Sequence, residues 1–327
     1  MVGSTVRNGN KPEVLQVRDL RVYFDTPRGS VRAVDGVDFY LRTGERLGLV
    51  GESGSGKTTM ALALMRMIKS PGRIATGSIM LDGKDLLKLS EAEMQSLRLS
   101  EIAMVAQGSM NSLNPVYRVR EQFVDAFADH GVRMTSREVD DRIATLLQQV
   151  GLKPDVAKMY PHELSGGMKQ RVCIAIAICL QPKVILADEP TSALDVVVQR
   201  QVMETLRQVQ SEIGAAVILV GHDMGLMAQF VDRLGVMYAG RLAEVSPVHD
   251  IFTKPSHPYT QLLISSLPSL EGKGEFKGIP GLPPSLLDLP EGCSFHPRCP
   301  YATERCRSEE PKMKEIRLDT YAACHLL

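Results

Sequence analysis

The sequence lacks an excess of charge of either sign, because its 327 residues carry 38 basic and 38 acidic side chains. Proteins that bind nucleic acid through its phosphates usually display a surplus of lysine and arginine, so the balance predicts no nucleic-acid partner. The sequence also lacks any apolar run of the roughly 18–20 residues that a membrane-spanning helix needs. The longest run, residues 172–180, has the length of a buried helix.

The amino-terminal segment lacks the apolar stretch of a secretory signal peptide. Residues 1–11 are polar and glycine-rich, and we expect a disordered tail over residues 1–13. A cytosolic protein is therefore expected. In that compartment the six cysteines are more readily thiols or metal ligands than disulfides.

The densest motif, residues 51–59, reads G-E-S-G-S-G-K-T-T and lies between an apolar strand pattern and a helical pattern. Glycines let the backbone curl so that its N–H groups point at an anion, and the helix start adds partial positive charge. Lys57 is expected to reach the outer phosphates, and the Thr58 hydroxyl to hold Mg²⁺. The predicted phosphate-binding residues are Gly51, Ser53, Gly54, Ser55, Gly56, Lys57, Thr58 and Thr59.

Two further strand patterns end in polar side chains that suit phosphoryl chemistry. The apolar run 184–187 leads to Asp188, suited to gripping Mg²⁺, and to Glu189, placed to polarise an attacking water. The run 216–220 leads to His222. Because open α/β sheets bind ligands at the carboxyl ends of their strands, we expect the imidazole of His222 to contact the terminal phosphate.

A third motif, residues 164–171, begins a helix that is apolar nearly all round with Ser165, Gly166 and Gly167. Such a start is an anion site, although Ser-Gly-Gly is also common in loops. Gln107 ends another strand pattern at 102–106. The motif at 164–171 and Gln107 become informative through their order along the chain relative to the phosphate loop and the two carboxylates.

Two regions leave alternatives open. Tyr23 or Phe24, on an alternating strand pattern, is either an adenine-stacking aromatic or a core residue.

After residue 252 proline, glycine and serine increase, and four cysteines follow with the spacing C-x5-C-x6-C-x17-C. Structural zinc prefers tighter pairs and cytosolic disulfides are disfavoured, whereas four thiolates can hold a [4Fe–4S] cluster; free thiols are the remaining alternative. The four are Cys293, Cys299, Cys306 and Cys324.

In order, these motifs resemble the complete set of an ABC-transporter ATPase subunit, over about residues 14–250: Walker A at 51–59, the Q-loop at Gln107, the signature at 164–171, Walker B at 184–189, the D-loop at 192–195 and the H-switch at His222. The loop sequence 51–57, the segments 112–115 and 257–260, and the cysteine-rich tail further resemble the oligopeptide/dipeptide importer subfamily.

The resemblance implies roles that the pattern alone does not give. Phe24 is the better match to the family's adenine-stacking aromatic and Tyr23 the second. Gln107 joins Glu189 and His222 as a catalytic residue and joins Thr58 at Mg²⁺. Asp195 contributes to the nucleotide site. Related importers carry a [4Fe–4S] cluster on cysteines with similar spacing, so ATP, Mg²⁺ and this cluster are the expected cofactors.

The resemblance also implies an assembly. Two ATPase subunits, the second expected to be a paralogue, pair head to tail, so that residues 165–167 of one cap ATP on the other. Two transmembrane permease subunits and an extracytoplasmic solute-binding protein complete the complex. The chain is then a peripheral protein at the cytoplasmic face of the inner membrane. The expected cargo is oligopeptide or dipeptide, with oligosaccharide or nickel as alternatives.

The predicted architecture is α/β: a RecA-like P-loop ATPase core with an antiparallel β-lobe over about 14–106 and 181–250, together the ATPase domain 14–250. An α-helical signature subdomain is inserted at about 107–180, and a C-terminal iron–sulfur domain follows at 251–327. A soluble ATPase of DNA repair or translation is disfavoured, because no sustained heptads separate Gln107 from Ser165 and the chain has one cassette.

Overall fold

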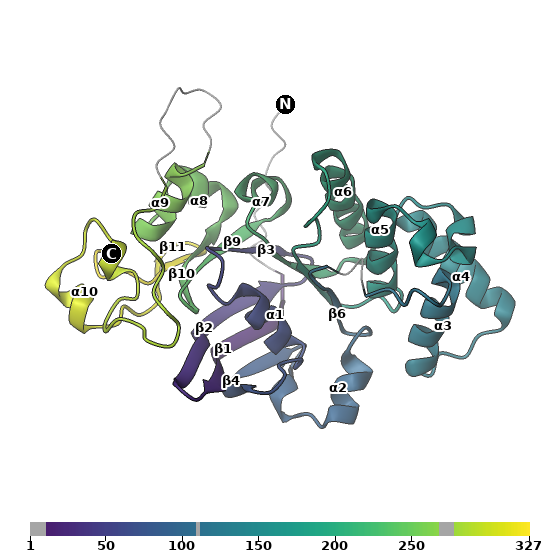
Figure 1. Ribbon diagram of the computed structural model, residues 1–327, viewed down its shortest axis with the longest axis horizontal. Helices are drawn as coiled ribbons and strands as arrows, with labels where there is room; N and C mark the ends of the chain where they lie inside the picture. Colours follow the sequence, from purple (N-terminus) through teal and green to yellow (C-terminus); the bar gives the residue numbers. More distant parts are fainter. Residues whose placement is uncertain (1–10, 109–111, 268–277) are drawn as a thin grey trace.

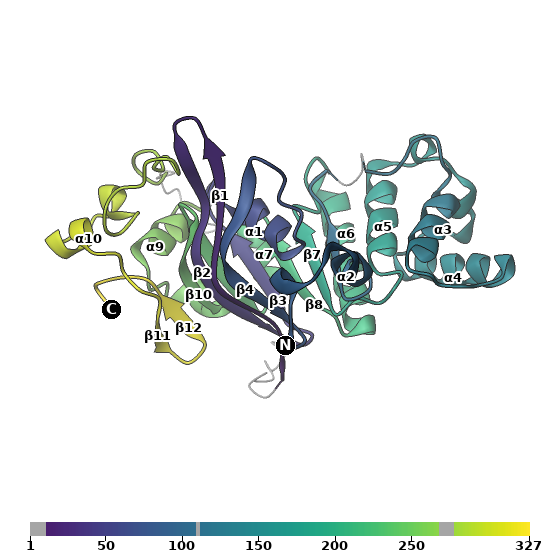
Figure 2. The ribbon, with the colours of Figure 1, turned by 90° about the horizontal axis from the view of Figure 1, so that it is seen from below.

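The structure is a computed structural model that describes residues 11–108, 112–267 and 278–327 (Figure 1). Residues 1–10 of the expected tail, and residues 109–111 of the segment after Gln107, lie outside the described residues. Two β-sheets form the centre of the molecule, with one group of helices at one end and the C-terminal segment at the other (Figures 1 and 2).

The β-lobe is a four-stranded antiparallel sheet with the order β2-β1-β4-β5. The alternating pattern around Tyr23 and Phe24 predicted a strand, and β1 confirms it. The lobe's strands are β1 (Glu13–Thr26), β2 (Gly29–Arg42), β4 (Gly72–Leu81) and β5 (Lys84–Asp85).

The core sheet has eight strands in the order β11-β12-β10-β9-β3-β8-β7-β6. Strands β9, β3, β8, β7 and β6 are parallel neighbours, and their continuous Val/Ile/Leu runs suit a sheet that is covered on both faces. The carboxyl ends of these strands therefore share one edge. The strands are β3 (Arg46–Val50), β6 (Ile102–Val105), β7 (Val184–Asp188), β8 (Ala216–Val220), β9 (Arg233–Tyr238), β10 (Arg241–Pro247), β11 (Lys314–Arg317) and β12 (Thr320–Ala322).

Helices α3, α4 and α5 gather at one end of the molecule, away from the C-terminal segment with α9 and α10 (Figures 1 and 2). None of the helices in the described ranges is long and apolar enough to cross a bilayer. The helices are α1 (Lys57–Leu64), α2 (Glu91–Leu97), α3 (Val119–Asp129), α4 (Ser136–Gln149), α5 (Gly166–Ala177), α6 (Val196–Ile213), α7 (Met224–Phe230), α8 (Val248–Thr253), α9 (Pro258–Ser265) and α10 (Glu304–Ser308).

Local signals set several helix ends. A capping box begins α2, where the Ser90 side chain accepts from the Glu93 N–H and the Glu93 carboxylate accepts from the Ser90 N–H. Such a box satisfies two backbone donors that the helix cannot satisfy itself. Gly151, with φ of 68°, follows the end of α4, as a glycine C-cap predicts.

The C-terminal segment returns to both sheets. Strand β12 pairs with β10, and the hydroxyls of Ser246 and Thr320 lie 3.0 Å apart within this pairing. Earlier in the same segment, the Leu286 carbonyl accepts from the N–H of Arg32 in β2 at 2.9 Å. The C-terminal segment thus extends the core sheet through β12 and reaches the β-lobe through Leu286.

The prediction of a C-terminal iron–sulfur domain is wrong. Among the described residues, which include all four tail cysteines, no group of three or more His, Cys, Asp or Glu side chains is arranged to hold a metal ion. Burial raises the pKa of Cys293 to about 11 and also raises the pKa of Cys299 and Cys324. All four tail cysteines are free thiols, of which Cys306 and Cys324 are buried and Cys293 and Cys299 are partly buried.

Candidate nucleotide-binding site

The phosphate loop follows β3 and is shaped by two glycines that allow close backbone packing. A Cβ on Gly51 would lie 2.1 Å from the Met237 carbonyl oxygen, and one on Gly56 would lie 2.0 Å from the Ala33 carbonyl oxygen. Their φ angles of 147° and 100° favour glycine as well. Gly56 precedes α1, whose start is capped by no described side chain, so its N–H groups stay available to an anion.

Lys57 is buried at the base of this loop. Its Nζ donates to the carbonyl oxygens of Gly51 and Glu52 at 2.9 Å each and to the Ser55 hydroxyl at 3.3 Å. Burial lowers the pKa of Lys57, while the carboxylates of Glu189, Asp188 and Glu52 oppose that shift. The amine is thus held within the loop, where bound phosphate oxygens would replace the carbonyl acceptors.

Asp188 and Thr58 form the part of the site that suits a divalent cation. The Thr58 hydroxyl donates to Asp188 Oδ1 at 3.3 Å. Asp188 is fully buried, burial raises its pKa, and its Oδ2 has no hydrogen-bond partner within the described part of the chain. A buried carboxylate oxygen without a partner is costly, and Mg²⁺ binds carboxylate and hydroxyl oxygens, so these two residues fit Mg²⁺.

Glu189 lies next to them and is held on three sides. Its N–H donates to the Val220 carbonyl of β8 at 2.9 Å, with φ of 43°. Its Oε2 accepts from Gln107 Nε2 at 2.9 Å, and its Oε1 lies 3.4 Å from Nδ1 of His222. The structure therefore brings together Gln107, Glu189 and His222, which the sequence placed after three separate strands.

The signature residues do not join this group within one chain. Ser165 caps α5, where its hydroxyl accepts from the Met168 N–H at 3.3 Å, and both views show α5 apart from α1 (Figures 1 and 2). Gly166 and Gly167 begin α5, and Gly167 packs on α6, since a Cβ there would lie 2.5 Å from Val198 Cγ1. Asp195 caps α6 by accepting from two backbone N–H groups at 3.1 and 3.0 Å.

The two candidate adenine-stacking residues lie in β1. The Tyr23 hydroxyl donates to Asp35 Oδ1 at 2.7 Å, which gives this side chain a role within the β-lobe. The Phe24 ring is half-buried and lies against Gly72. The assignment of the stacking residue stays a prediction.

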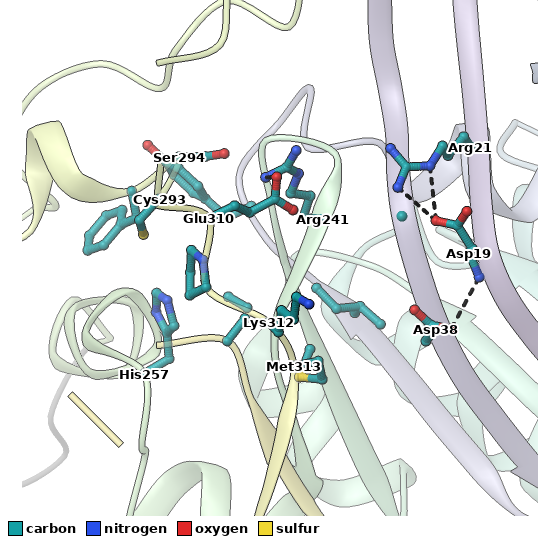
Figure 3. A pocket seen from close by; sticks show the side chains of 17 residues that line it. Asp19, Arg21, Asp38, Arg241, His257, Cys293, Ser294, Glu310, Lys312 and Met313 are labelled. Carbon is teal, nitrogen blue, oxygen red and sulfur yellow. Dashed lines mark hydrogen bonds and ion pairs between the residues drawn. The ribbon is translucent and has the colours of Figure 1, made fainter. Parts of the chain in front are cut away.

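A cavity of about 410 Å³ lies between the β-lobe and the C-terminal segment (Figure 3). Arg241, which lines it, binds Glu310 at 2.8 Å and Asp35 at 2.7 Å. Cys293 also lines it. No predicted nucleotide-binding residue lines this cavity.

The sequence did not predict the roles of Glu52, within the phosphate loop, or of Arg298 and Tyr259, which contact it. Arg298 forms an ion pair with Glu52, and the Tyr259 hydroxyl accepts the Glu52 N–H. A glutamate inside the glycine-rich loop and the His-Pro-Tyr segment were visible in the sequence. Nothing local links them, because Arg298 lies 246 positions after Glu52.

Comparisons with known proteins agree with this geometry. A family model described as ABC transporter matches residues 34–192, and a model described as oligopeptide/dipeptide transporter, C-terminal region, matches residues 243–306. The chain is 46% identical over 302 residues to the oligopeptide transport ATP-binding protein OppD of Salmonella typhimurium, covering 91% of this chain and 89% of that protein. It is 43% identical over 318 residues to the dipeptide transport ATP-binding protein DppD of Escherichia coli, covering 95% and 96%.

Solved structures give the same fold. A dimeric bacterial ABC transporter cassette, and a dimeric cassette in a post-hydrolysis state bound to ADP and Pi, each match with a TM-score of 0.64 and 27% identity, over 72% of this chain and 98% of theirs. The names of the relatives describe ATP-binding transport proteins and give no support for the expected [4Fe–4S] cofactor. That expectation is wrong for the cofactor as well as for the fold.

Proposed function

The chain belongs to the family of ABC-transporter ATPases, and we propose that it hydrolyses ATP at the carboxyl edge of its core sheet to power the import of oligopeptides or dipeptides. The observation that carries this proposal is the meeting of four strand ends at one place. There the Thr58–Asp188 pair lies beside Glu189, which Gln107 and His222 contact. The names of the OppD and DppD relatives support the choice of cargo.

In this proposal the loop N–H groups and Lys57 bind the phosphates of ATP. Thr58 and Asp188, with Gln107, hold Mg²⁺, which neutralises charge on the phosphates when it is bound. Glu189 accepts a proton from the attacking water. Gln107 fixes the Glu189 carboxylate, and His222 lies at the same edge to contact the terminal phosphate.

A second ATPase subunit, a paralogue in this proposal, completes the site. Residues 165–167 of one chain then cap ATP on the other, and Asp195 lies near the junction. Two supports are the position of α5 apart from α1 and the dimeric form of the similar cassettes. Two transmembrane permeases and an extracytoplasmic solute-binding protein complete the importer, which this subunit joins at the cytoplasmic face of the inner membrane.

Replacing Lys57 with Ala tests the ATP site. Among the described residues, Lys57 supplies the ammonium at the base of the loop. A hydrogen bond to a charged group contributes about 1.5–3 kcal/mol. The affinity of the full-length chain for ATP, measured by equilibrium titration, should fall about 10- to 150-fold. The exposed Lys69 provides the control: Lys69→Ala should bind like the parent. Parent-like binding by Lys57→Ala would disprove the assignment.

We also propose that the described residues 112–118, which precede α3, couple hydrolysis to the membrane subunits. In this segment the Asn114 N–H donates to Gln122 Oε1 of α3 at 3.0 Å. Beyond it Val116 and Tyr117 are 71% and 49% exposed. Exposed apolar side chains on a tethered segment suit contact with a partner.

Asn114→Ala and Pro115→Ala should therefore lower the peptide transported per ATP hydrolysed, by about 10-fold if each removes a central contact. Transport and phosphate release in reconstituted vesicles measure that ratio. Arg133→Ala, at an exposed site between α3 and α4, is the control and should keep the parent ratio. An unchanged ratio in both segment variants would exclude this coupling role.

A further inference from the structure

Glu52, the second residue of the phosphate loop, is held by two side chains from the C-terminal part of the chain. Arg298 binds its carboxylate twice, Nη1 to Oε2 at 2.7 Å and Nη2 to Oε1 at 2.9 Å. The Glu52 N–H donates to the Tyr259 hydroxyl at 3.0 Å. These partners lie 246 and 207 positions later in the sequence. Side chain and backbone of one loop residue are thus tied to the same distant segment.

Arg298 is fixed in place by its surroundings. Its side chain is 5% exposed, its Nε donates to the Pro280 carbonyl at 2.8 Å, and its Nη1 also approaches the Tyr238 hydroxyl at 3.3 Å. The hydrogen bond to Glu52 raises the pKa of Arg298, so the guanidinium stays charged. A planar two-point contact of this kind needs arginine, because lysine offers a single point charge.

Tyr259 is fixed by aromatic packing. It is fully buried, with ring centroids 4.6 Å from Tyr238 and 5.3 Å from Phe295. Burial raises the pKa of Tyr259, so its hydroxyl stays neutral and accepts the Glu52 N–H. The hydroxyl therefore marks a fixed point to which the loop backbone is attached.

Glu52 also contacts the lysine of the loop, because its carbonyl oxygen accepts from Lys57 Nζ at 2.9 Å. We propose that Arg298 and Tyr259 are positioning residues of the ATP site, which act through Glu52 to hold the phosphate loop and Lys57 in the conformation that receives ATP. The inference rests on the ATP-binding role proposed above for this loop. It gives the C-terminal segment a part in nucleotide binding.

A merely structural role for these contacts predicts a different result. If they only fasten the C-terminal segment, their loss reduces the fraction of folded chains, and each folded chain binds ATP as before. If they position the loop, each folded chain binds ATP more weakly. Equilibrium titration of the full-length chain with ATP and Mg²⁺ separates the two, because it gives the dissociation constant and the number of sites independently.

Arg298→Gln and Tyr259→Phe are the two test variants. Each leaves a group at Glu52 without its partner, and we expect the dissociation constant for ATP to rise about 5- to 30-fold with close to one site per chain. Tyr259→Phe removes a single oxygen and retains the packed ring, so it keeps the test valid if Arg298→Gln fails to fold. Parent affinity in Tyr259→Phe and in folded Arg298→Gln, or a loss of sites alone, would overturn the proposal.

Two further variants test whether the effect passes through Glu52. The double variant Glu52→Gln with Arg298→Gln should bind ATP no more weakly than whichever of its two single variants binds ATP more weakly, since both changes break the same pair. Losses of ATP affinity that add in the double variant would contradict this. Arg305→Gln removes an exposed arginine of the same segment, paired with Glu309 at 2.7 Å, and should bind like the parent. If the parent itself fails to bind ATP, the proposed function fails, whereas weakened binding by Arg305→Gln would defeat only the present inference.

Discussion

Replacing Glu189 with Gln is expected to retain ATP binding and to lower ATP turnover about 10²- to 10⁴-fold, the range for loss of a general base. The Glu189 carboxylate is held by Gln107 at 2.9 Å and by His222 at 3.4 Å, beside the Thr58–Asp188 pair. A glutamine has nearly the same shape but cannot accept the proton of the attacking water. The nucleotide contacts of Lys57 and the loop are unchanged, so binding survives.

Phosphate release from the assembled complex and ATP titration of the same preparation check this prediction. Glu212→Gln is the matched control, because Glu212 lies exposed on α6, where its carboxylate accepts from Gln208 Nε2 at 2.9 Å. It should hydrolyse ATP at the parent rate. Near-parent hydrolysis by Glu189→Gln would show that another group activates the water.

Ser165→Arg should abolish hydrolysis while leaving the affinity of the isolated chain for ATP almost unchanged. Ser165 lies at the start of α5, apart from α1 in both views, so in this account it meets only the nucleotide bound by a partner subunit. Removing a donor that faces developing charge costs about 10²- to 10³-fold in rate, and the long side chain also prevents the two subunits from closing. Nucleotide affinity of the monomer, ATP-dependent dimerisation and phosphate release measure the three effects.

The substitution also removes a helix cap, which costs about 1 kcal/mol. Ser90→Arg therefore serves as the control, since Ser90 caps the exposed start of α2 and should leave dimerisation and hydrolysis intact. A large loss of monomer affinity in Ser165→Arg would mean that the signature residues act on ATP within their own chain.

The sheet edge could be predicted from the sequence because its signals are local and regular. Continuous apolar runs predicted β3, β7 and β8, and the runs of β7 and β8 lead to Asp188 and His222. Parallel strands place their carboxyl ends together, so the meeting of Asp188, Glu189 and His222 followed from the order of motifs. The structure confirms this meeting, while the chemical roles of the residues stay predictions.

The C-terminal segment could not be predicted in this way. The Arg298–Glu52 pair and the joining of β12 to β10 depend on contacts between distant parts of the chain, for which no local periodicity exists. The spacing of four cysteines suggested a cluster, but spacing says nothing about where the side chains point. The choice between Phe24 and Tyr23 as the adenine-stacking residue stays a prediction, and the Tyr23 hydroxyl binds Asp35 within the β-lobe.

We propose that ATP hydrolysis at the carboxyl edge of the core sheet, where Glu189 lies, powers peptide import. The most direct measurement is uptake of a labelled peptide into proteoliposomes that contain the complex co-purified with this chain, with phosphate release followed in the same vesicles. Uptake is expected to require ATP on the side of this subunit and to stop, together with phosphate release, in the Glu189→Gln complex. Peptide uptake that continues at the parent rate in that complex would show that hydrolysis at Glu189 does not power import.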